Sequence, residues 1–533
     1  MVARLLLWAL SLAVFAVPVQ GADYFVSPAG SDSARGTGAA APLKTIAKAA
    51  SLVGPGDAIR IAPGLYDEKV VLGASGTPDA PITIRADGNG EVVLTAAEPD
   101  PAAWDRKFAL NLSKQSHVIV EGITFRHCAA WILMADAHHI TIRRCVFDGG
   151  RIYNLLRINN SSYVRILNCR FPFALKQTGV RTEAGWIPTP GADYIEIYRN
   201  SHHNLVDGCE FGPITHVAVA IEPFEKGTSP TFNIVRNCVF RNAEWKAVGI
   251  LNGAQHTLVE NNLCQGRAAL FVHNESEHMI LRRNRFVGYR DVTGGNPDIT
   301  QRGAIRIGGG ATNGRVYHNL FHDNQRTITS FNMGKPVPGN VWKNNILFDN
   351  AQTVFLGFKD LQGQNRMPFL HNVLRGKAAG EKLIQLDKEF YTLPEAAETF
   401  PDLYRGNLDA DPQFIDAAKE DFRLKNASPC IDAGTSLAVA TTGGRGRTIP
   451  VDDPLCFCDG WELIDGDEVV VGANAPARVV QVDDQKKTLT LDRDIVWNSG
   501  DAVSQPYSGK APDIGPHEFE ASSALEPHGL GQH

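Results

Sequence analysis

The sequence predicts an all-β protein whose main body is a right-handed parallel β-helix of about ten coils. Two observations predict this fold: a short phrase recurs along the middle of the chain, and the same residue types return at the same places within it. Different patterns at the two ends predict an N-terminal cap and a small C-terminal β insert.

The recurring phrase is six residues long and reads VEGITF, IRRCVF, ILNCRF, VDGCEF, VRNCVF, VENNLC, LRRNRF, VYHNLF and VWKNNI. Its shortest spacings, 22 to 25 residues, fit one coil of three short strands with turns between them. The fourth position forms a column of Ile123, Cys145, Cys169, Cys209, Cys238, Asn262, Asn284, Asn319 and Asn344. The sixth position forms a column of Phe125, Phe147, Phe171, Phe211, Phe240, Cys264, Phe286, Phe321 and Ile346.

Alternation within each phrase sends every second side chain inward, so equivalent side chains stack about 4.8 Å apart. The asparagines predict a tight turn whose amides bond backbone groups of their own and neighbouring coils. The cysteines of that column are then small, buried and reduced. A third column, three residues before each phrase, favours a repeated stacking position over catalysis; it contains His117, His139, Tyr163, His203, Phe232, His256, His278 and Asn313.

The N-terminus has the order of a secretory signal peptide: Arg4, an apolar run over residues 5–17, then small residues ending near Gly21 and Ala22. We therefore expect a secreted or periplasmic protein. The predicted divisions are a signal peptide (1–21), an N-terminal cap with the first coils (22–110), the β-helix (111–435), an antiparallel β insert (436–510) and a closing segment with a tail (511–533).

The insert is predicted from WELIDGDEVVVG, ARVVQVDD and KTLTLDRDIVW, which alternate like antiparallel strands. Cys456 and Cys458 lie too close in sequence for an unstrained bond, so a disulfide, if formed, is expected between Cys430 and one of them. The net charge of −6 argues against a nucleic-acid or anionic-membrane partner. We expect a monomer, because capped β-helices need no partner at their ends.

The stretches DYFVSPAGSD, APLKTIAKAASLVGPGDAIRIAPGLYDEKVVL and PITIRADG resemble the capping opening of secreted right-handed β-helix proteins. DADPQFIDAAKEDFRLKNASPCIDAG and APDIGPHEF resemble their closing segment. With the coils, this resemblance covers most of the chain. It implies a carbohydrate partner, since such proteins are mostly polysaccharide lyases of the pectate, alginate and chondroitin lyase type, beside epimerases and glycoside hydrolases. QRGAIRIGGG is similar to alginate and chondroitin lyases, without their Lys and Arg motifs.

A second continuous sheet is predicted from LLRIN, YIEIY, AVAIE, AVGIL, LFVHN, AIRIG and ITSFN. If Ile158, Ile197, Ile221, Ile250, Val272 and Ile307 point inward, one outward row contains Arg157, Glu196, Ala220, Gly249, Phe271 and Arg306. The next contains Asn159, Tyr198, Glu222, Leu251 and His273. Two inserts, 172–193 with Lys176 and 287–303 with Arg302, are expected to wall a groove over this sheet.

The groove floor carries His216, Glu222, Trp245, Lys246, Arg267 and His273, a mixture suited to a sugar chain. Our preferred interpretation is a polysaccharide lyase acting on an acidic polymer. It needs a base, for which Lys246, His273 and His216 are candidates, and cations such as Arg306, Arg267 and Arg157. We expect no cofactor, because the calcium used by many such lyases wants clustered carboxylates, whereas Glu196, Glu222 and Glu275 are scattered in the sequence. The predicted substrate-binding residues are Arg157, Glu196, Tyr198, Trp245, Arg267, Arg302 and Lys176.

Two alternatives remain open. An inverting glycoside hydrolase needs two carboxyl groups, and Glu196 and Glu222 would lie roughly 8 Å apart on neighbouring coils. A non-catalytic carbohydrate-binding protein would instead rely on aromatic platforms such as Trp186, Trp245, Phe271 and Phe331.

Overall fold

The computed structural model describes residues 21–96, 108–150, 154–174, 180–182, 185–187, 193–213, 216–241, 246–266, 269–273, 275–290, 303–331, 335–352, 354–356 and 365–520. The predicted signal peptide lies outside these residues, apart from Gly21. Within the described part of the chain, no helix is long and apolar enough to cross a membrane.

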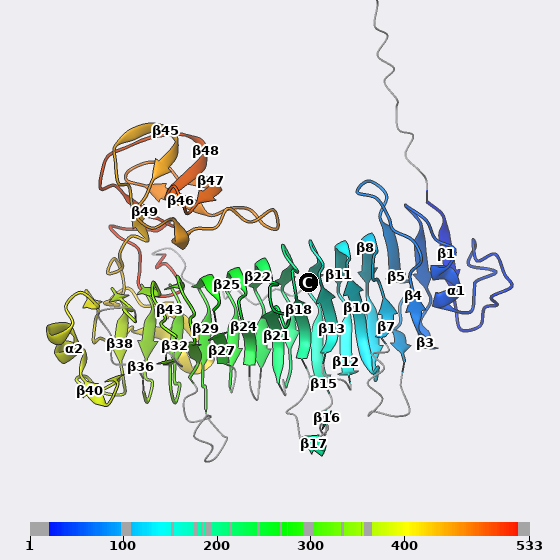
Figure 1. Ribbon diagram of the computed structural model, residues 1–533, viewed down its shortest axis with the longest axis horizontal. Coiled ribbons are helices and arrows are strands. Elements are labelled where there is room, and N and C mark those ends of the chain that lie inside the picture. The colour runs from blue at the N-terminus through cyan, green and yellow to red at the C-terminus, as the bar shows by residue number, and fades with distance from the viewer. Residues whose placement is uncertain are drawn as a thin grey trace, which may run out of the picture.

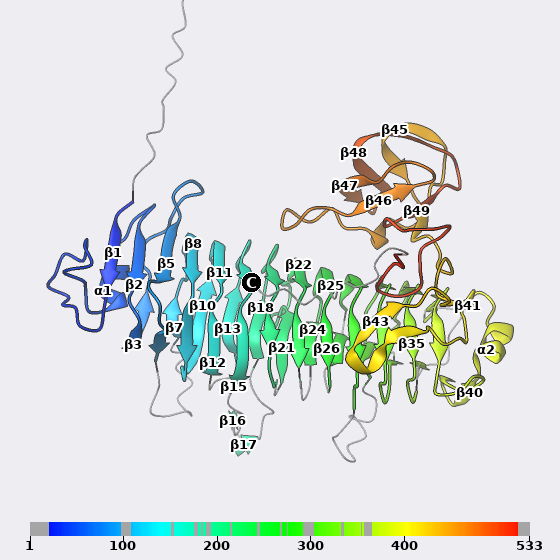
Figure 2. The ribbon, with the colours of Figure 1, turned by 180° about the vertical axis from the view of Figure 1, so that it is seen from behind.

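Three long sheets run along the molecule and confirm the predicted fold class (Figure 1). We name them sheets A, B and C. Each coil contributes one strand to each sheet, and neighbouring coils pair in parallel. The exception among them is the last strand of sheet C, which pairs antiparallel with its neighbour. Figure 2 shows the same stack of coils from behind.

Sheet A has 14 strands: β1 (Asp23–Val26), β2 (Ala58–Ile61), β5 (Ile82–Ala86), β8 (Ser116–Glu121), β11 (His138–Arg143), β14 (Arg165–Leu167), β19 (Leu205–Asp207), β22 (Thr231–Arg236), β25 (Gln255–Glu260), β28 (Glu277–Arg282), β31 (Arg315–Tyr317), β34 (Val341–Lys343), β37 (Phe369–Leu370) and β41 (Tyr404–Arg405). Sheet B has 12 strands: β3 (Gly64–Asp67), β6 (Val92–Thr95), β9 (Ile123–Arg126), β12 (Val146–Gly150), β15 (Arg170–Ala174), β20 (Glu210–Phe211), β23 (Val239–Arg241), β26 (Leu263–Gln265), β29 (Arg285–Val287), β32 (Leu320–His322), β35 (Ile346–Phe348) and β38 (Val373–Arg375).

Sheet C has 13 strands: β4 (Val70–Val71), β7 (Phe108–Asn111), β10 (Ala130–Ala135), β13 (Asn154–Asn159), β18 (Asp193–Tyr198), β21 (Val217–Glu222), β24 (Lys246–Leu251), β27 (Ala269–His273), β30 (Ile305–Gly308), β33 (Ile328–Phe331), β36 (Val354–Leu356), β39 (Ile384–Leu386) and β40 (Glu389–Tyr391). Smaller elements are helix α1 (Ile46–Ala50) near the N-terminal end, helix α2 (Leu393–Thr399) at the other end, and the hairpins β16–β17 (Val180–Thr182, Gly185–Ile187) and β42–β43 (Phe414–Asp416, Asp421–Leu424).

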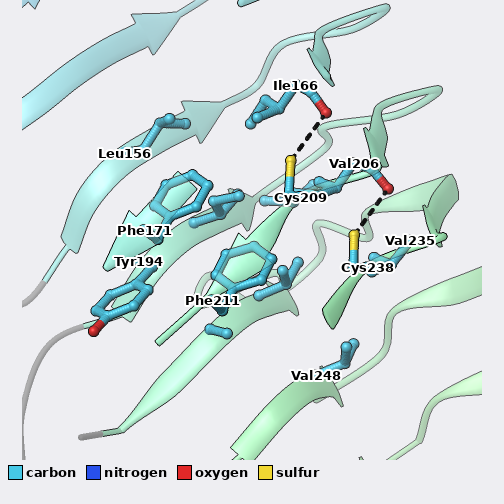
Figure 3. Close-up of a cluster of buried hydrophobic side chains, with 14 of the residues drawn as sticks. Leu156, Ile166, Phe171, Tyr194, Val206, Cys209, Phe211, Val235, Cys238 and Val248 are labelled. Atoms are coloured by element: carbon cyan, nitrogen blue, oxygen red, sulfur yellow. Dashed lines mark hydrogen bonds between the residues drawn. The ribbon is translucent and has the colours of Figure 1, made fainter. Parts of the chain in front are cut away.

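The interior is built from identical side chains stacked coil on coil. Phe147 and Phe171 lie with ring centroids 4.9 Å apart and nearly parallel, and Phe171 and Phe211 follow at 4.6 Å. Figure 3 shows this stack beside Cys209 and Cys238, whose thiols donate to the carbonyl oxygens of Ile166 and Val206 on the preceding coil. The predicted phenylalanine column is therefore a continuous core.

The cysteines do not form disulfides. All nine are buried and free, so the condition under which Cys430 was expected to pair with Cys456 or Cys458 is not met. Cys456 and Cys458 are fully buried within the C-terminal part of the protein, where the Cys456 thiol donates to a backbone carbonyl. The four cysteines of the first column are small buried side chains, as predicted.

The asparagines of the same column form a ladder of hydrogen bonds. Asn284 donates from its backbone N–H and its amide to Oδ1 of Asn319, at 2.9 and 3.0 Å. Asn319 repeats both contacts with Asn345. The coil of the last predicted phrase therefore differs by one residue from the predicted alignment, which placed Asn344 and Ile346 in the columns. Here Phe321 pairs with Leu347, and Trp342 turns inward to fill the core.

The third column forms the corner at which each coil enters sheet A. Its eight residues all have φ between 47° and 57°, in the left-handed region. Rings in neighbouring coils lie face to face over much of its length, for example His117 on His139 and His139 on Tyr163, both at 4.7 Å. The predicted stacking role of this column is confirmed.

Residues 438–504 form a separate antiparallel sheet, which we call the C-terminal domain. Its strands follow the order β44 (Ala438–Val439), β49 (Ala502–Ser504), β46 (Glu468–Val471), β47 (Ala477–Asp483), β48 (Thr488–Trp497) and β45 (Gly444–Pro450). The domain stands beside the outer face of sheet A (Figure 1). Apolar side chains of β19, β22, β25 and β28 join its core. Asp467 accepts two hydrogen bonds from the buried guanidinium of Arg282, at 2.6 and 2.7 Å.

The asparagine ladder predicts a large stability loss on truncation. Asn319→Ala would remove the acceptor of the buried backbone N–H of Asn284 and one of the two acceptors of its amide, which keeps its bond to the carbonyl oxygen of Val259. We expect the free energy of unfolding to fall by about 2–4 kcal/mol, since each unsatisfied buried polar group costs roughly 1–3 kcal/mol. Urea unfolding measures this difference. Asn498→Ala, at an exposed site, should change stability little, and equal losses in both variants would contradict the ladder's importance.

Candidate active site

Polar side chains gather on the outer face of sheet C over four neighbouring strands, β13, β18, β21 and β24. The register places Arg157, Glu196, Ala220 and Gly249 side by side in one row. Asn159, Tyr198 and Glu222 form the next row. These rows agree with the sequence-based expectation.

The start of β18 departs from the simple alternation of inward and outward side chains. Tyr194 and Ile195 are consecutive residues, yet both pack in the core. Asp193 consequently lies on the same side of the sheet as Glu196 rather than opposite to it. Asp193 pairs with Val217, which in turn pairs with Lys246.

His216 and Asp193 form the best-defined pair of this face. Nδ1 of His216 lies 2.6 Å from Oδ1 of Asp193, and the carboxylate is 1% exposed whereas the imidazole is 15% exposed. A carboxylate at Nδ1 fixes the tautomer and orientation of the ring. Nε2 is then the ring atom that would take a proton from a substrate.

Arg157 and Glu196 form a buried ion pair. Nε of Arg157 donates to Oε2 of Glu196 at 2.8 Å, and the side chains are 7% and 0% exposed. The guanidinium also lies over the ring of Tyr198, 4.9 Å from its centroid. The two charges compensate each other, so this pair adds rigidity to the floor without adding net charge.

The surroundings of Glu222 change its titration. Burial, reinforced by the negative charges of Asp193 and Glu196, raises its pKa to about 8. The opposing influences are weaker: the positive charge of Lys246, and a hydrogen bond at 3.3 Å from the amide of Asn252. Glu222 is therefore mostly protonated and uncharged at neutral pH.

Lys246 begins β24 on the coil after His216. Its backbone N–H donates to the carbonyl oxygen of His216 at 3.0 Å, which fixes the two residues on adjacent strands. Its side chain is half-buried. Lys246 therefore brings a cation to the face that carries His216 and the neutral Glu222.

The remaining predicted residues are placed less centrally. Arg306 occupies the expected row, but three strands from Ala220, roughly 14 Å at the usual strand spacing. The backbone of His273 lies in β27, opposite Leu251; its side chain falls outside the described residues. So do Trp245, Arg267, Arg302 and Lys176, together with most of both inserts.

Sequence reasoning missed Asp193 and Asn252. The sequence pattern places Asp193 at the end of the insert 172–193, whereas in the structure it is the first residue of the strand DYIEIY. An available signal was the acidic residue at the start of a strand whose later outward positions are also polar. Asn252 follows β24 in a left-handed conformation typical of asparagine, with φ of 56°.

A second concave surface lies far from this face. A cleft of about 430 Å³ separates the corner column from the C-terminal domain, lined by residues that include His203, Phe232, His278, Trp461 and Asp484. Trp461 packs edge-on against Phe232. Contacts around the cleft join the β-helix to the C-terminal domain: the imidazole of His278 contacts the carbonyl oxygen of Leu455, and nearby Tyr163 donates to Glu462.

The buried carboxyl of Glu222 predicts a pH-dependent stability. Since its pKa is higher in the folded chain than the ordinary value of 4.5, its favourable contribution is complete below about pH 4.5 and is lost as the pH rises through 8. Glu222→Gln cannot lose a proton. Relative to the natural protein, its free energy of unfolding should rise by about 3–4 kcal/mol between pH 5 and 9. Urea unfolding across this range tests it, with the exposed Glu210→Gln as a control expected to show no such trend.

Comparison with known proteins agrees with this fold. A family model described as "Right handed beta helix region" matches residues 108–286, and one described as "Protein of unknown function (DUF1565)" matches residues 28–73. No curated protein matches the chain.

Several solved structures are similar. Pectate lyase Pel9A has 13% identity and a TM-score of 0.42, over 94% of this chain and 97% of the lyase. The PL6 family alginate lyase AlyGC has 18% identity and a TM-score of 0.46, over 69% of this chain and 50% of that one. The GH136 lacto-N-biosidase from Eubacterium ramulus has 14% identity and a TM-score of 0.42, over 69% and 66%. The family model over residues 108–286 and the three parallel sheets show that the chain contains a right-handed parallel β-helix, as its repeated phrase predicts.

Proposed function

We propose that this protein is a polysaccharide lyase that cleaves an acidic polysaccharide on the outer face of sheet C. The observation that carries the proposal is the Asp193–His216 pair beside Lys246 on the next strand. Such an arrangement offers a base and a cation to one sugar unit. Elimination from a uronic acid needs both, because the base removes the proton next to the carboxylate and the cation stabilises the anion that results.

Exposure distinguishes His216 from the other groups. Asp193 and Glu196 are at most 1% exposed, whereas His216 is 15% exposed. The buried carboxylates are thus placed to support other side chains, and the imidazole is placed to meet a substrate. In the proposed reaction Nε2 of His216 takes the C5 proton while the bond from C4 to the glycosidic oxygen breaks. The imidazolium then returns the proton to the departing oxygen, and a C4–C5 double bond remains.

Lys246 is the proposed partner of the substrate carboxylate. The neutral state of Glu222 matters here, because an ionised Glu222 would compensate the lysine charge. A cation on this face favours an anionic sugar. Calcium is not part of this proposal; assays with and without a chelator would test it.

A glycoside hydrolase is a second candidate, favoured by one observation. Glu222 carries a proton near neutral pH, while Glu196 is ionised beside Arg157. Two carboxyl groups with different protonation states are what acid–base hydrolysis requires. Glu196 pairs with Ala220, so Glu222 is displaced by one strand and two residues, roughly 8 Å between Cα atoms. If the two side chains project in parallel, their carboxyl groups fall within the range of about 6.5–9.5 Å found in inverting enzymes. In this function Glu222 would be the acid and Glu196 the base.

Replacement of His216 tests its proposed role as the base. His216→Gln should lower kcat by roughly 10²–10⁴ on the polysaccharide that the protein cleaves, as is usual for loss of a general base. The ultraviolet absorbance of the unsaturated product measures the rate across a panel of acidic polysaccharides. His127→Gln changes an exposed histidine elsewhere and should leave the rate unchanged. A fully active His216→Gln enzyme would rule out the proposed base.

The second prediction separates the two functions. Glu222→Gln preserves the shape of a neutral carboxyl group, so a lyase that uses Glu222 only in its uncharged form should keep most of its activity at neutral pH. A hydrolase would lose roughly 10²-fold or more, because the amide cannot donate the catalytic proton. Product absorbance and new reducing ends are followed together. Reducing ends without absorbance, abolished by Glu222→Gln, would replace the lyase proposal with hydrolysis.

A further inference from the structure

Three imidazoles meet at the N-terminal end of the corner column, at the turn where the chain passes from sheet C to sheet A. His117 comes from β8, and His138 and His139 come from β11. Nδ1 of His138 lies 3.0 Å from Nδ1 of His139. The ring of His117 stacks on His139 at 4.7 Å and meets His138 edge-on at 5.6 Å. His138 and His139 are exposed, and His117 is half-buried.

The backbone holds these residues in place. β8 and β11 pair in parallel with His138 opposite Ser116, so the three histidines occupy adjacent positions on two neighbouring coils. His117 and His139 share the left-handed conformation of the corner, each with φ of 54°. A ligand here would meet side chains carried by a rigid sheet rather than by a loop.

We propose that His117, His138 and His139 bind a divalent transition-metal ion of the zinc class. Two nitrogen ligands that each lie 2.0–2.1 Å from zinc are roughly 2.9–3.4 Å apart, and the two Nδ1 atoms are already 3.0 Å apart. One nitrogen from each of the three rings lies within 4.8 Å of the others. A small rotation of the His117 side chain brings in the third ligand. Imidazole suits zinc, copper and nickel, and three histidines leave a fourth position for water.

The same corner contains a natural comparison two coils further on. His202 and His203 repeat the close contact, with their Nδ1 atoms 2.9 Å apart. The position equivalent to His117 is occupied there by Tyr163, whose ring stacks on His203 and whose hydroxyl donates to Glu462. That pair offers two imidazoles where the first site offers three. Among the residues that the structure describes, only the first group brings three such ligands together.

Metal titration of the full chain, prepared without a histidine tag, tests the site. Calorimetry with Zn²⁺ should give one ion per chain in the natural protein. His117→Phe should weaken binding roughly tenfold or more, because one of three ligands is lost. This variant should fold, since Phe232 occupies the same column with φ of 55°. His138→Ala should also weaken binding, and the exposed His127→Ala should not. Circular dichroism checks the fold of each variant.

A gain of binding provides the opposite test. Tyr163→His would place a third imidazole beside His202 and His203, and we expect it to bind a second Zn²⁺ ion. Co²⁺ in place of Zn²⁺ reports coordination by nitrogen through its visible absorption. The proposal is overturned if the natural protein binds no ion, or if His117→Phe binds as tightly as the natural protein. Failure of Tyr163→His to gain an ion would overturn the argument that the third imidazole decides binding.

Discussion

The spacing of neighbouring parallel strands is the constraint on which the rest of this structure depends. Equivalent residues of successive coils lie about 4.8 Å apart, a distance at which aromatic rings stack and amides reach one another. The phenylalanine stack, with centroids 4.6 to 5.0 Å apart, and the asparagine ladder both satisfy it. So does the ring column at the corner of sheet A. Each coil is stabilised by its neighbours, because a single coil cannot bury its own inward face.

This constraint explains why the fold could be predicted from the sequence. Stacking selects the same residue type at the same place in each coil, so the three-dimensional columns appear directly as aligned letters. The predicted alignment was wrong where two neighbouring residues of the same type could occupy one position of the column. The last phrase contains Asn344 and Asn345 in succession, and only the inward packing of Trp342 decides which of them enters the ladder. Sequence separation likewise gives no information on whether two buried thiols approach each other, so the state of Cys430, Cys456 and Cys458 could not be predicted.

The candidate active site could be predicted only in part. The rows containing Arg157, Glu196 and Glu222 follow from strand alternation and from the coil register. The Asp193–His216 pair does not follow from it, because Tyr194 and Ile195 both face inward and reverse the side on which Asp193 lies. The raised pKa of Glu222 also depends on burial and on two neighbouring carboxylates. These are properties of the assembled face, and no single strand contains them.

The C-terminal domain has a consequence for how the chain matures. Leu205, Ile234, Leu258 and Ile280 point away from the coil interior and are buried because this domain covers them. Arg282, on β28, finds its acidic partner Asp467 185 residues later in the chain. During synthesis the coils therefore exist for a time with an uncovered apolar strip and an arginine that still lacks this partner. Until the last quarter of the sequence has been synthesised, that apolar strip is exposed and can associate with other apolar surfaces. The C-terminal domain covers it only at the end of synthesis.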